Sequence, residues 1–165
     1  MKIEKVYLDM DGVLCDFEKK FAELYGKDAL DNRDRKKWTK SWPDFIENRQ
    51  FAKLDWFPGG QMLLAYLRSK NIPIEILSSS GGMEHHVEVS EQKKEWLKTH
   101  GIDYKANIVP GRRYKKAYAG PGIILIDDTE DIITDFNEAG GIGILHKNVE
   151  PTLKHLKSLF DNEET

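Results

Sequence analysis

The sequence predicts an α/β fold, with a doubly wound, Rossmann-type parallel sheet covered by helices on both faces. Two observations lead to this prediction. Short apolar runs of the kind that form strands buried on both faces recur along the chain. Amphipathic helical patterns separate these runs. Strands that alternate with helices build a parallel sheet, because each crossover returns the chain to the same end of the sheet.

Five segments are expected to be strands. Three are strong candidates, namely "VYLDM" (6–10), "IPIEILSSS" (72–80) and "GIILIDD" (122–128), which are rich in aliphatic residues and end in polar ones. Two weaker candidates are "ANIV" (106–109) and "GIGIL" (141–145). In sheets of this kind ligands bind at the carboxyl ends of the strands, so the polar ends mark the candidate site.

Four segments between and after these strands are expected to be helices: residues 59–71, 89–101, 128–141 and 151–160. The first places Leu63, Tyr66 and Leu67 on one face, as a core-facing helix requires. The second is expected to begin at Ser90, a residue type that caps helices, and to end at Gly101. The last has a proline at its first turn, where the missing N–H costs nothing.

The segment 17–57 does not fit this alternation. It is polar, helix-like and rich in aromatic residues, and it would make the first crossover far longer than a usual connection. We interpret it as a small helical cap inserted after the first strand, over the C-terminal edge of the sheet. The chain then divides into a core of residues 1–16 and 58–165 and a cap of residues 17–57.

The composition narrows the class of protein. A chain of 165 residues suits one domain with a small insertion. Its formal net charge is −3, whereas a nucleic-acid-binding protein usually carries a positive charge. The single cysteine, Cys15, cannot form an internal disulfide. The chain enters a strand pattern without a leader pattern and contains no apolar run long enough to span a bilayer. We therefore expect a cytoplasmic protein with neither a membrane nor a stable nucleic-acid partner.

Acidic residues stand at the ends of two of the strong strands. Asp9 and Asp11 end the first, Asp127 and Asp128 end the third, and serines 78–80 end the second. In a parallel sheet these ends meet at one edge, which would bring four carboxylates close together. Their mutual repulsion requires a cation. Oxygen-only ligands select a hard ion, of which Mg²⁺ is the abundant one, so we expect these carboxylates to hold Mg²⁺.

The same edge has the residues that phosphoryl transfer needs. Asp9 would point into the site as an aspartate nucleophile, and Asp11 would protonate the leaving oxygen and then take a proton from water. Basic residues precede the third strand in "GRRYKK", which carries Arg112, Arg113, Lys115 and Lys116. One of these cations would pair with both the nucleophile and the phosphate and stabilise the charge of the transition state.

The sequence resembles a known family through four motifs in order. "DMDGV", a strand that ends in serine, a lysine and "IIL" followed by "IDD" are similar to the four motifs of the haloacid dehalogenase-like (HAD) phosphatases. Within that superfamily the chain most resembles the 5′(3′)-deoxyribonucleotidases. This closer likeness involves "DMDGVLCDFE", "FAKLDWFPGG", "SSSGGMEHHVEVSEQKKEWL" and "RRYK". The resemblance implies a HAD-like core and an aspartyl-phosphate intermediate.

The resemblance also implies roles for individual residues. Asp9 would be the nucleophile and Asp11 the acid/base. The implied phosphate-binding residues are Ser78 with Ser79 beside it, Arg113, and Lys115 with Lys116 as its rival. The implied metal ligands are the Asp9 carboxylate, the Asp11 main-chain carbonyl and one or both of Asp127 and Asp128. Phe17 matches an aromatic residue that lines the nucleoside pocket. Serine stands where the second motif usually has threonine, and Ser80 where it has proline.

The roles of several aromatic residues and of Lys93 stay open between two interpretations. Trp38, Trp42 and Phe51 either stack on a nucleobase or form the small core of the cap. Lys93 is expected on a solvated helix face, with a minor phosphate role from the resemblance, and Trp96 in the core. The cap is short, which leaves the preference for base and sugar open.

These observations predict a Mg²⁺-dependent phosphomonoesterase that acts through an aspartyl-phosphate. The expected substrate is a small phosphate ester, first of all a deoxyribonucleoside monophosphate, with a place in deoxyribonucleotide catabolism. Three alternatives stay open: another small phosphorylated metabolite such as a sugar phosphate, a DNA 3′-phosphate, and a phosphate- or partner-binding module without turnover. A homodimer is compatible with the sequence.

Overall fold

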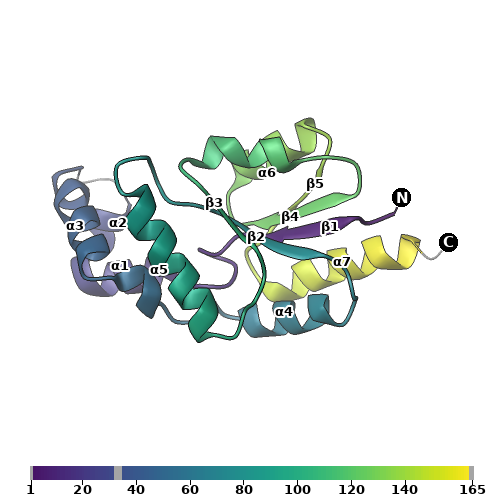
Figure 1. The fold of residues 1–165 in the computed structure, drawn as a ribbon, viewed down its shortest axis with the longest axis horizontal. Coiled ribbons are helices and arrows are strands. Elements are labelled where there is room, and N and C mark those ends of the chain that lie inside the picture. Colours follow the sequence, from purple (N-terminus) through teal and green to yellow (C-terminus); the bar gives the residue numbers. More distant parts are fainter. Residues whose placement is uncertain (1, 32–34, 164–165) are drawn as a thin grey trace.

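A computed structural model describes residues 2–31 and 35–163. It contains one sheet of five parallel strands in the order β3-β2-β1-β4-β5 (Figure 1). The strands are β1 (Lys5–Leu8), β2 (Ile74–Ser79), β3 (Ala106–Val109), β4 (Ile123–Asp127) and β5 (Ile142–Leu145). All five expected strands are therefore present, and the α/β doubly wound fold class is confirmed.

Helices cover both faces of the sheet, as Figure 1 shows with α6 on one side and α4 and α7 on the other. One face packs against α4 (Gly60–Arg68), α5 (His86–Thr99) and α7 (Val149–Glu163). The opposite face packs against α6 (Glu130–Glu138), next to the short 3₁₀ helix η2 (Arg112–Tyr118). Within β1, Val6 and Leu8 belong to the first layer and Tyr7 to the second. A strand buried on both faces explains the nearly continuous apolar run.

The segment between β1 and α4 is helical. It contains α1 (Phe17–Tyr25), α2 (Lys27–Leu30), α3 (Arg35–Glu47) and the 3₁₀ helix η1 (Gln50–Lys53). In Figure 1, α1, α2 and α3 lie at the end of the molecule opposite to the two termini. Phe21 and Phe45 of this segment share one hydrophobic cluster with Leu8 of β1. The division into a cap of residues 17–57 and a core stays a prediction.

A glutamine of α5 ties the helical segment to the core. The buried Gln92 side chain donates to the Ile46 carbonyl at 2.7 Å and accepts the Phe51 N–H at 3.2 Å. The Trp96 indole donates to the Leu54 carbonyl at 2.8 Å. These bonds satisfy the backbone groups at the end of α3 and around η1, so α5 fixes the segment over the edge of the sheet.

Helix α5 begins before its expected first residue. It starts at His86, which places Ser90 inside the helix, so the prediction that Ser90 caps it is wrong. The turn after β2 closes with a bond from the His86 N–H to the Met83 carbonyl, and the chain is helical from that point. The expected end is confirmed within two residues, because Gly101 follows with a φ of 70°.

No helix in residues 2–31 and 35–163 is long and apolar enough to cross a membrane.

Candidate active site

Three carboxylates meet at the C-terminal edge of the sheet. β1 and β4 are neighbours, with Leu8 opposite Ile126, so the residues that follow them come together. Asp9, Asp127 and Asp128 each offer an oxygen that lies within 4.8 Å of the other two. Asp127 is fully buried and Asp9 is nearly so. Oxygen atoms gathered in this way form a donor set that a hard divalent cation prefers.

A tight turn brings Asp11 to the same edge. The Met10 carbonyl accepts the N–H groups of Leu14 and Cys15 at 2.8 and 2.9 Å, which reverses the chain directly after the strand. Gly12 in this turn has a φ of 80°, and a Cβ there would overlap the Asp128 carboxylate. Two features therefore require a glycine at this position of the "DMDG" motif: the left-handed backbone and the close approach of the Asp128 side chain.

Lys115 of η2 lies inside the acidic cluster. Its ammonium is 3.2 Å from Asp9 Oδ1 and donates to Asp127 Oδ2 at 2.7 Å, and the residue is only 2% exposed. Burial alone would lower the pKa of Lys115, but the two carboxylates raise it above its ordinary value, so the lysine stays charged. Its neighbour Lys116 is exposed. Of the two rival lysines, the structure brings Lys115 to the carboxylates.

A second lysine, Lys93, reaches the site from α5. Its ammonium donates to Asp11 Oδ2 at 3.0 Å, to Ser78 Oγ at 2.7 Å and to the Ser79 carbonyl at 2.8 Å. The residue is 2% exposed, so the expectation of a solvated lysine is wrong. The sequence did contain the signal. Lys93 lies four residues after Val89 and three before Trp96, on the face of α5 that both of these buried residues share.

The two lysines do not balance the four carboxylates. When all four are ionised, Asp9, Asp11, Asp127 and Asp128 face two ammonium groups, which leaves an excess of two negative charges. Among the described residues, no cationic side chain pairs with the Asp128 carboxylate, whose Oδ1 accepts the Thr129 hydroxyl at 3.1 Å. Burial, followed by repulsion from Asp9 and Asp127, raises the pKa of Asp128 to about 7. An excess of this size matches one divalent cation.

Aromatic residues of the helical segment line one wall of the site. A cavity of about 540 Å³, here called the reaction cavity, is lined by Asp9, Asp11, Ser78, Ser79, Lys115 and Asp128 together with Phe17, Trp38, Trp42 and Phe51. The rings also pack on one another. Phe17 stacks on Phe51 with centroids 5.5 Å apart, and Trp38 on Trp42 at 5.2 Å. These residues therefore pack on one another and also line the cavity, and their stacking on a nucleobase stays a prediction.

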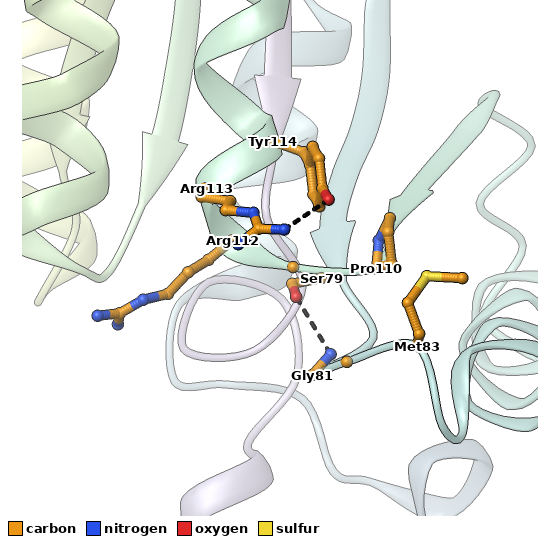
Figure 2. A pocket seen from close by; sticks show the side chains of 9 residues that line it. Ser79, Gly81, Met83, Pro110, Arg112, Arg113 and Tyr114 are labelled. Carbon is orange, nitrogen blue, oxygen red and sulfur yellow. Dashed lines mark hydrogen bonds between the residues drawn. The ribbon is translucent and has the colours of Figure 1, made fainter.

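Arg113, for which the resemblance implies phosphate binding, packs against Tyr114. Its guanidinium donates to the Tyr114 hydroxyl at 2.8 Å and lies over that ring, as Figure 2 shows. Arg113 does not line the reaction cavity, whereas Arg112 does, with its guanidinium paired to Asp131 at 2.8 Å. A direct contact of Arg113 with the transferred phosphate therefore stays a prediction.

Solved structures of the same fold include hydrolases. The chain is similar to a hydrolase from Streptococcus pneumoniae TIGR4, with a TM-score of 0.55 and 17% identity over 96% of this chain and 100% of that chain. It is also similar to the HAD domain of the effector protein Lem4 from Legionella pneumophila (inactive mutant), with a TM-score of 0.50 and 15% identity over 98% and 95%. Identities this low establish the fold alone. No curated protein sequence matches the chain.

The chain therefore shares its fold with these HAD-like structures. The family described as "5' nucleotidase, deoxy (Pyrimidine), cytosolic type C protein" matches residues 2–161. Because this match spans nearly the whole sequence, the chain belongs to that family and is a phosphoric monoester hydrolase. The resemblance to HAD phosphatases close to the deoxyribonucleotidases is confirmed.

Proposed function

We propose that the protein is a Mg²⁺-dependent deoxyribonucleotidase that removes phosphate from deoxyribonucleoside monophosphates through an aspartyl-phosphate. The observation that carries the proposal is the meeting of Asp9, Asp11, Lys115 and Asp128 in one cavity with an aromatic wall. The family match over residues 2–161 supports a nucleotide as the substrate, and it supports a cytosolic location and a role in deoxyribonucleotide catabolism.

Asp9 is the nucleophile of the proposed reaction. Its Oδ1 accepts the Met10 N–H at 2.8 Å and lies 3.2 Å from Lys115, so these contacts hold the carboxylate in a fixed orientation. A carboxylate oxygen of Asp9 bonds to phosphorus while the ester P–O bond breaks, and Asp11 gives its proton to the leaving nucleoside oxygen. Asp11 then takes a proton from water. The water oxygen attacks phosphorus, inorganic phosphate leaves, and the Asp9 carboxylate is restored.

Asp11 has the environment of a general acid. Partial burial raises the pKa of its carboxyl above the ordinary value, although the Lys93 ammonium opposes this effect. Its side chain lines the reaction cavity, and its Oδ1 is a buried atom without a hydrogen-bond partner among the described residues, which leaves that oxygen to carry the proton for the leaving group. Lys93 fixes the position of this carboxylate through Oδ2.

Ser78 and Lys115 form the seat for the phosphate, and Lys93 positions the Ser78 side chain. The Ser78 oxygen accepts a hydrogen bond from Lys93, so its own O–H proton remains available for a phosphate oxygen. Lys115 already contacts the nucleophile, and its charge would stabilise the charge that develops on the phosphoryl oxygens. Both lysines are rigidly held, which favours preorganised stabilisation of the transition state.

The donor set fits Mg²⁺ because it consists only of oxygen atoms around an excess of two negative charges. Asp9 and Asp128 would hold the ion with their carboxylates and Asp11 with its main-chain carbonyl. Asp127 would act on Lys115 instead, since its Oδ2 binds Lys115 and its Oδ1 accepts the Thr129 N–H at 3.0 Å. When bound, Mg²⁺ neutralises the cluster and polarises the phosphoryl group.

A substrate panel tests the proposal. With Mg²⁺ present, thymidylate, deoxyuridylate and their 3′ isomers should be hydrolysed with a higher kcat/KM than p-nitrophenyl phosphate or a sugar phosphate. Asp9→Asn should abolish turnover while the protein stays folded by circular dichroism. If p-nitrophenyl phosphate or a sugar phosphate proves as good as the nucleotides, the nucleotidase assignment is wrong. If the Asp9→Asn variant keeps its rate, the proposed nucleophile is wrong.

A further inference from the structure

A second cavity opens beside the reaction cavity. It has a volume of about 520 Å³ and is lined by Met83, Pro110 and Tyr114 and by the two arginines Arg112 and Arg113. Figure 2 shows Tyr114 and Arg113 on one side of this arginine cavity and Met83 and Pro110 on the other. Its side chains combine apolar surface with positive charge, a combination that suits an organic anion.

The charge in the arginine cavity belongs to Arg113. Among the described residues, no carboxylate lies within ion-pair distance of its guanidinium, and none of the residues that line the cavity is acidic. The guanidinium lies 4.8 Å from the centroid of the Tyr114 ring and donates to the hydroxyl of that residue. Tyr114 thereby holds the cation in place while leaving other N–H groups free for a ligand.

The arginine cavity adjoins the reaction cavity. The two share Ser79, Gly81 and Arg112 as lining residues. Ser79 accepts the Gly81 N–H at 3.1 Å, which leaves the serine O–H proton free to donate toward a ligand. Lys115 and Arg113 lie two residues apart on η2, so the reacting phosphate and the arginine cavity are held at a fixed separation.

We propose that the arginine cavity is a subsite for a second phosphate on the leaving group of the substrate, so that the protein also hydrolyses nucleoside 3′,5′-bisphosphates. This inference rests on the proposed function. One phosphate lies at Asp9 and Lys115, and the other is bound by Arg113 and Ser79. Hydrolysis consumes one water, breaks one P–O ester bond and leaves inorganic phosphate and a nucleoside monophosphate. The free cation of Arg113 and the lack of acidic lining residues carry the proposal.

The phosphate of the next nucleotide in a short DNA end presents the same chemistry. The observations favour the small molecule, because the formal net charge of the chain is −3 and a DNA-end enzyme should carry a basic track beyond the first phosphates. A 3′-phosphorylated trithymidylate distinguishes the two sources in the same assay.

The experiment compares thymidine 5′-monophosphate with thymidine 3′,5′-bisphosphate as substrates for the wild type and for Arg113→Gln. The wild type should have a lower KM for the bisphosphate. In Arg113→Gln the ratio of kcat/KM for bisphosphate to that for monophosphate should fall by about tenfold, as expected for the loss of one charged hydrogen-bonding partner. Lys154→Gln removes the same charge from the exposed face of α7 and should leave the ratio unchanged.

Two further arms separate the proposal from its alternatives. Tyr114→Phe removes the hydroxyl that orients Arg113 and should lower the same ratio in part. Calorimetric binding of the bisphosphate to Asp9→Asn, with and without Arg113→Gln, measures the subsite in the absence of turnover. A better kcat/KM for the trithymidylate than for the bisphosphate would overturn the assignment to a small molecule.

The outcomes of the proposal and of the proposed function can be told apart. If the monophosphate is hydrolysed but Arg113→Gln lowers both substrates equally, Arg113 binds the transferred phosphate and the subsite is refuted. A second outcome is that the wild type hydrolyses neither substrate, while Asp9→Asn binds the bisphosphate more tightly than the Asp9→Asn, Arg113→Gln double variant does. In that case the proposed function fails and the subsite stands.

Discussion

Replacement of Lys115 by methionine is the sharpest test of the electrostatics. The change removes an ammonium that contacts Asp127 at 2.7 Å and Asp9 at 3.2 Å, and it leaves a side chain of similar length. Asp127 is fully buried, so it would lose its cation without gaining access to water. Removing one partner of a buried charge pair costs about 3–5 kcal/mol. Burial of the lysine charge is itself unfavourable, so we expect a loss of about 3 kcal/mol at neutral pH.

The loss should depend on pH. The pKa of Asp127 is about 6 even with Lys115 present, because burial and Asp9 raise it. Without Lys115 that pKa rises further, so the folded state binds a proton that the unfolded state, with a pKa of about 3.9, has released. Stability then falls as the pH rises between these two values and through the pKa of the folded state. The deficit of Lys115→Met is therefore larger at pH 8 than at pH 5.5.

The assay is urea unfolding in EDTA at both pH values, followed by circular dichroism. Thermal midpoints offer a second readout, with a decrease of roughly 10 °C expected for about 3 kcal/mol in a chain of this length. The control is Lys116→Met, which removes an exposed ammonium from the next position of η2 and should change stability by less than about 0.5 kcal/mol. Equal deficits in the two variants, or a deficit that does not change with pH, would refute the reasoning.

Two other substitutions have definite expected results. Gly12→Ala places a Cβ against the Asp128 carboxylate at a φ of 80°, so unfolding should become easier by about 1–3 kcal/mol, and phosphatase activity should fall more than the folded fraction does; normal activity with normal urea unfolding would contradict this. His146 is fully buried, with Nδ1 on the Thr152 hydroxyl, and burial lowers its pKa below 6.5. Below that value the unfolded state binds a proton that the folded state does not, so His146 makes the protein lose stability as the pH falls from 7 to 5. Urea unfolding of His146→Gln over this range should show a smaller loss, and a loss equal to that of the wild type would contradict the assignment.

The convergence of the carboxylates could be predicted from the sequence because it depends on topology alone. Once the strands at 6–10 and 122–128 are parallel neighbours, Asp9 and Asp127 must lie at the same edge. The choice of Lys115 over Lys116 could not be predicted in this way. Both lysines precede β4 at similar distance in the sequence, and only the turn of η2 decides which side chain enters the cluster.

The position of Lys93 illustrates a different limit. A charged residue on a helix is usually solvated, and that general rule outweighed the periodicity that placed Lys93 beside Val89 and Trp96. Its burial is stable because Asp11, Ser78 and the Ser79 carbonyl accept its three hydrogen bonds, and these partners come from distant segments. For Arg113 the motif predicted an arginine at this position but not the orientation of its side chain. That orientation is set by the hydrogen bond to the Tyr114 hydroxyl.

Four carboxylates and two lysines together are expected to form a site for one divalent cation. Isothermal titration of the metal-free protein with MgCl₂ measures this binding, with Asp128→Asn as the partner variant. We expect one Mg²⁺ to bind per chain of the wild type, and the affinity to be lower by more than about tenfold in Asp128→Asn. If the wild type takes up no Mg²⁺, or if Asp128→Asn binds it as tightly, the carboxylates do not form this metal site.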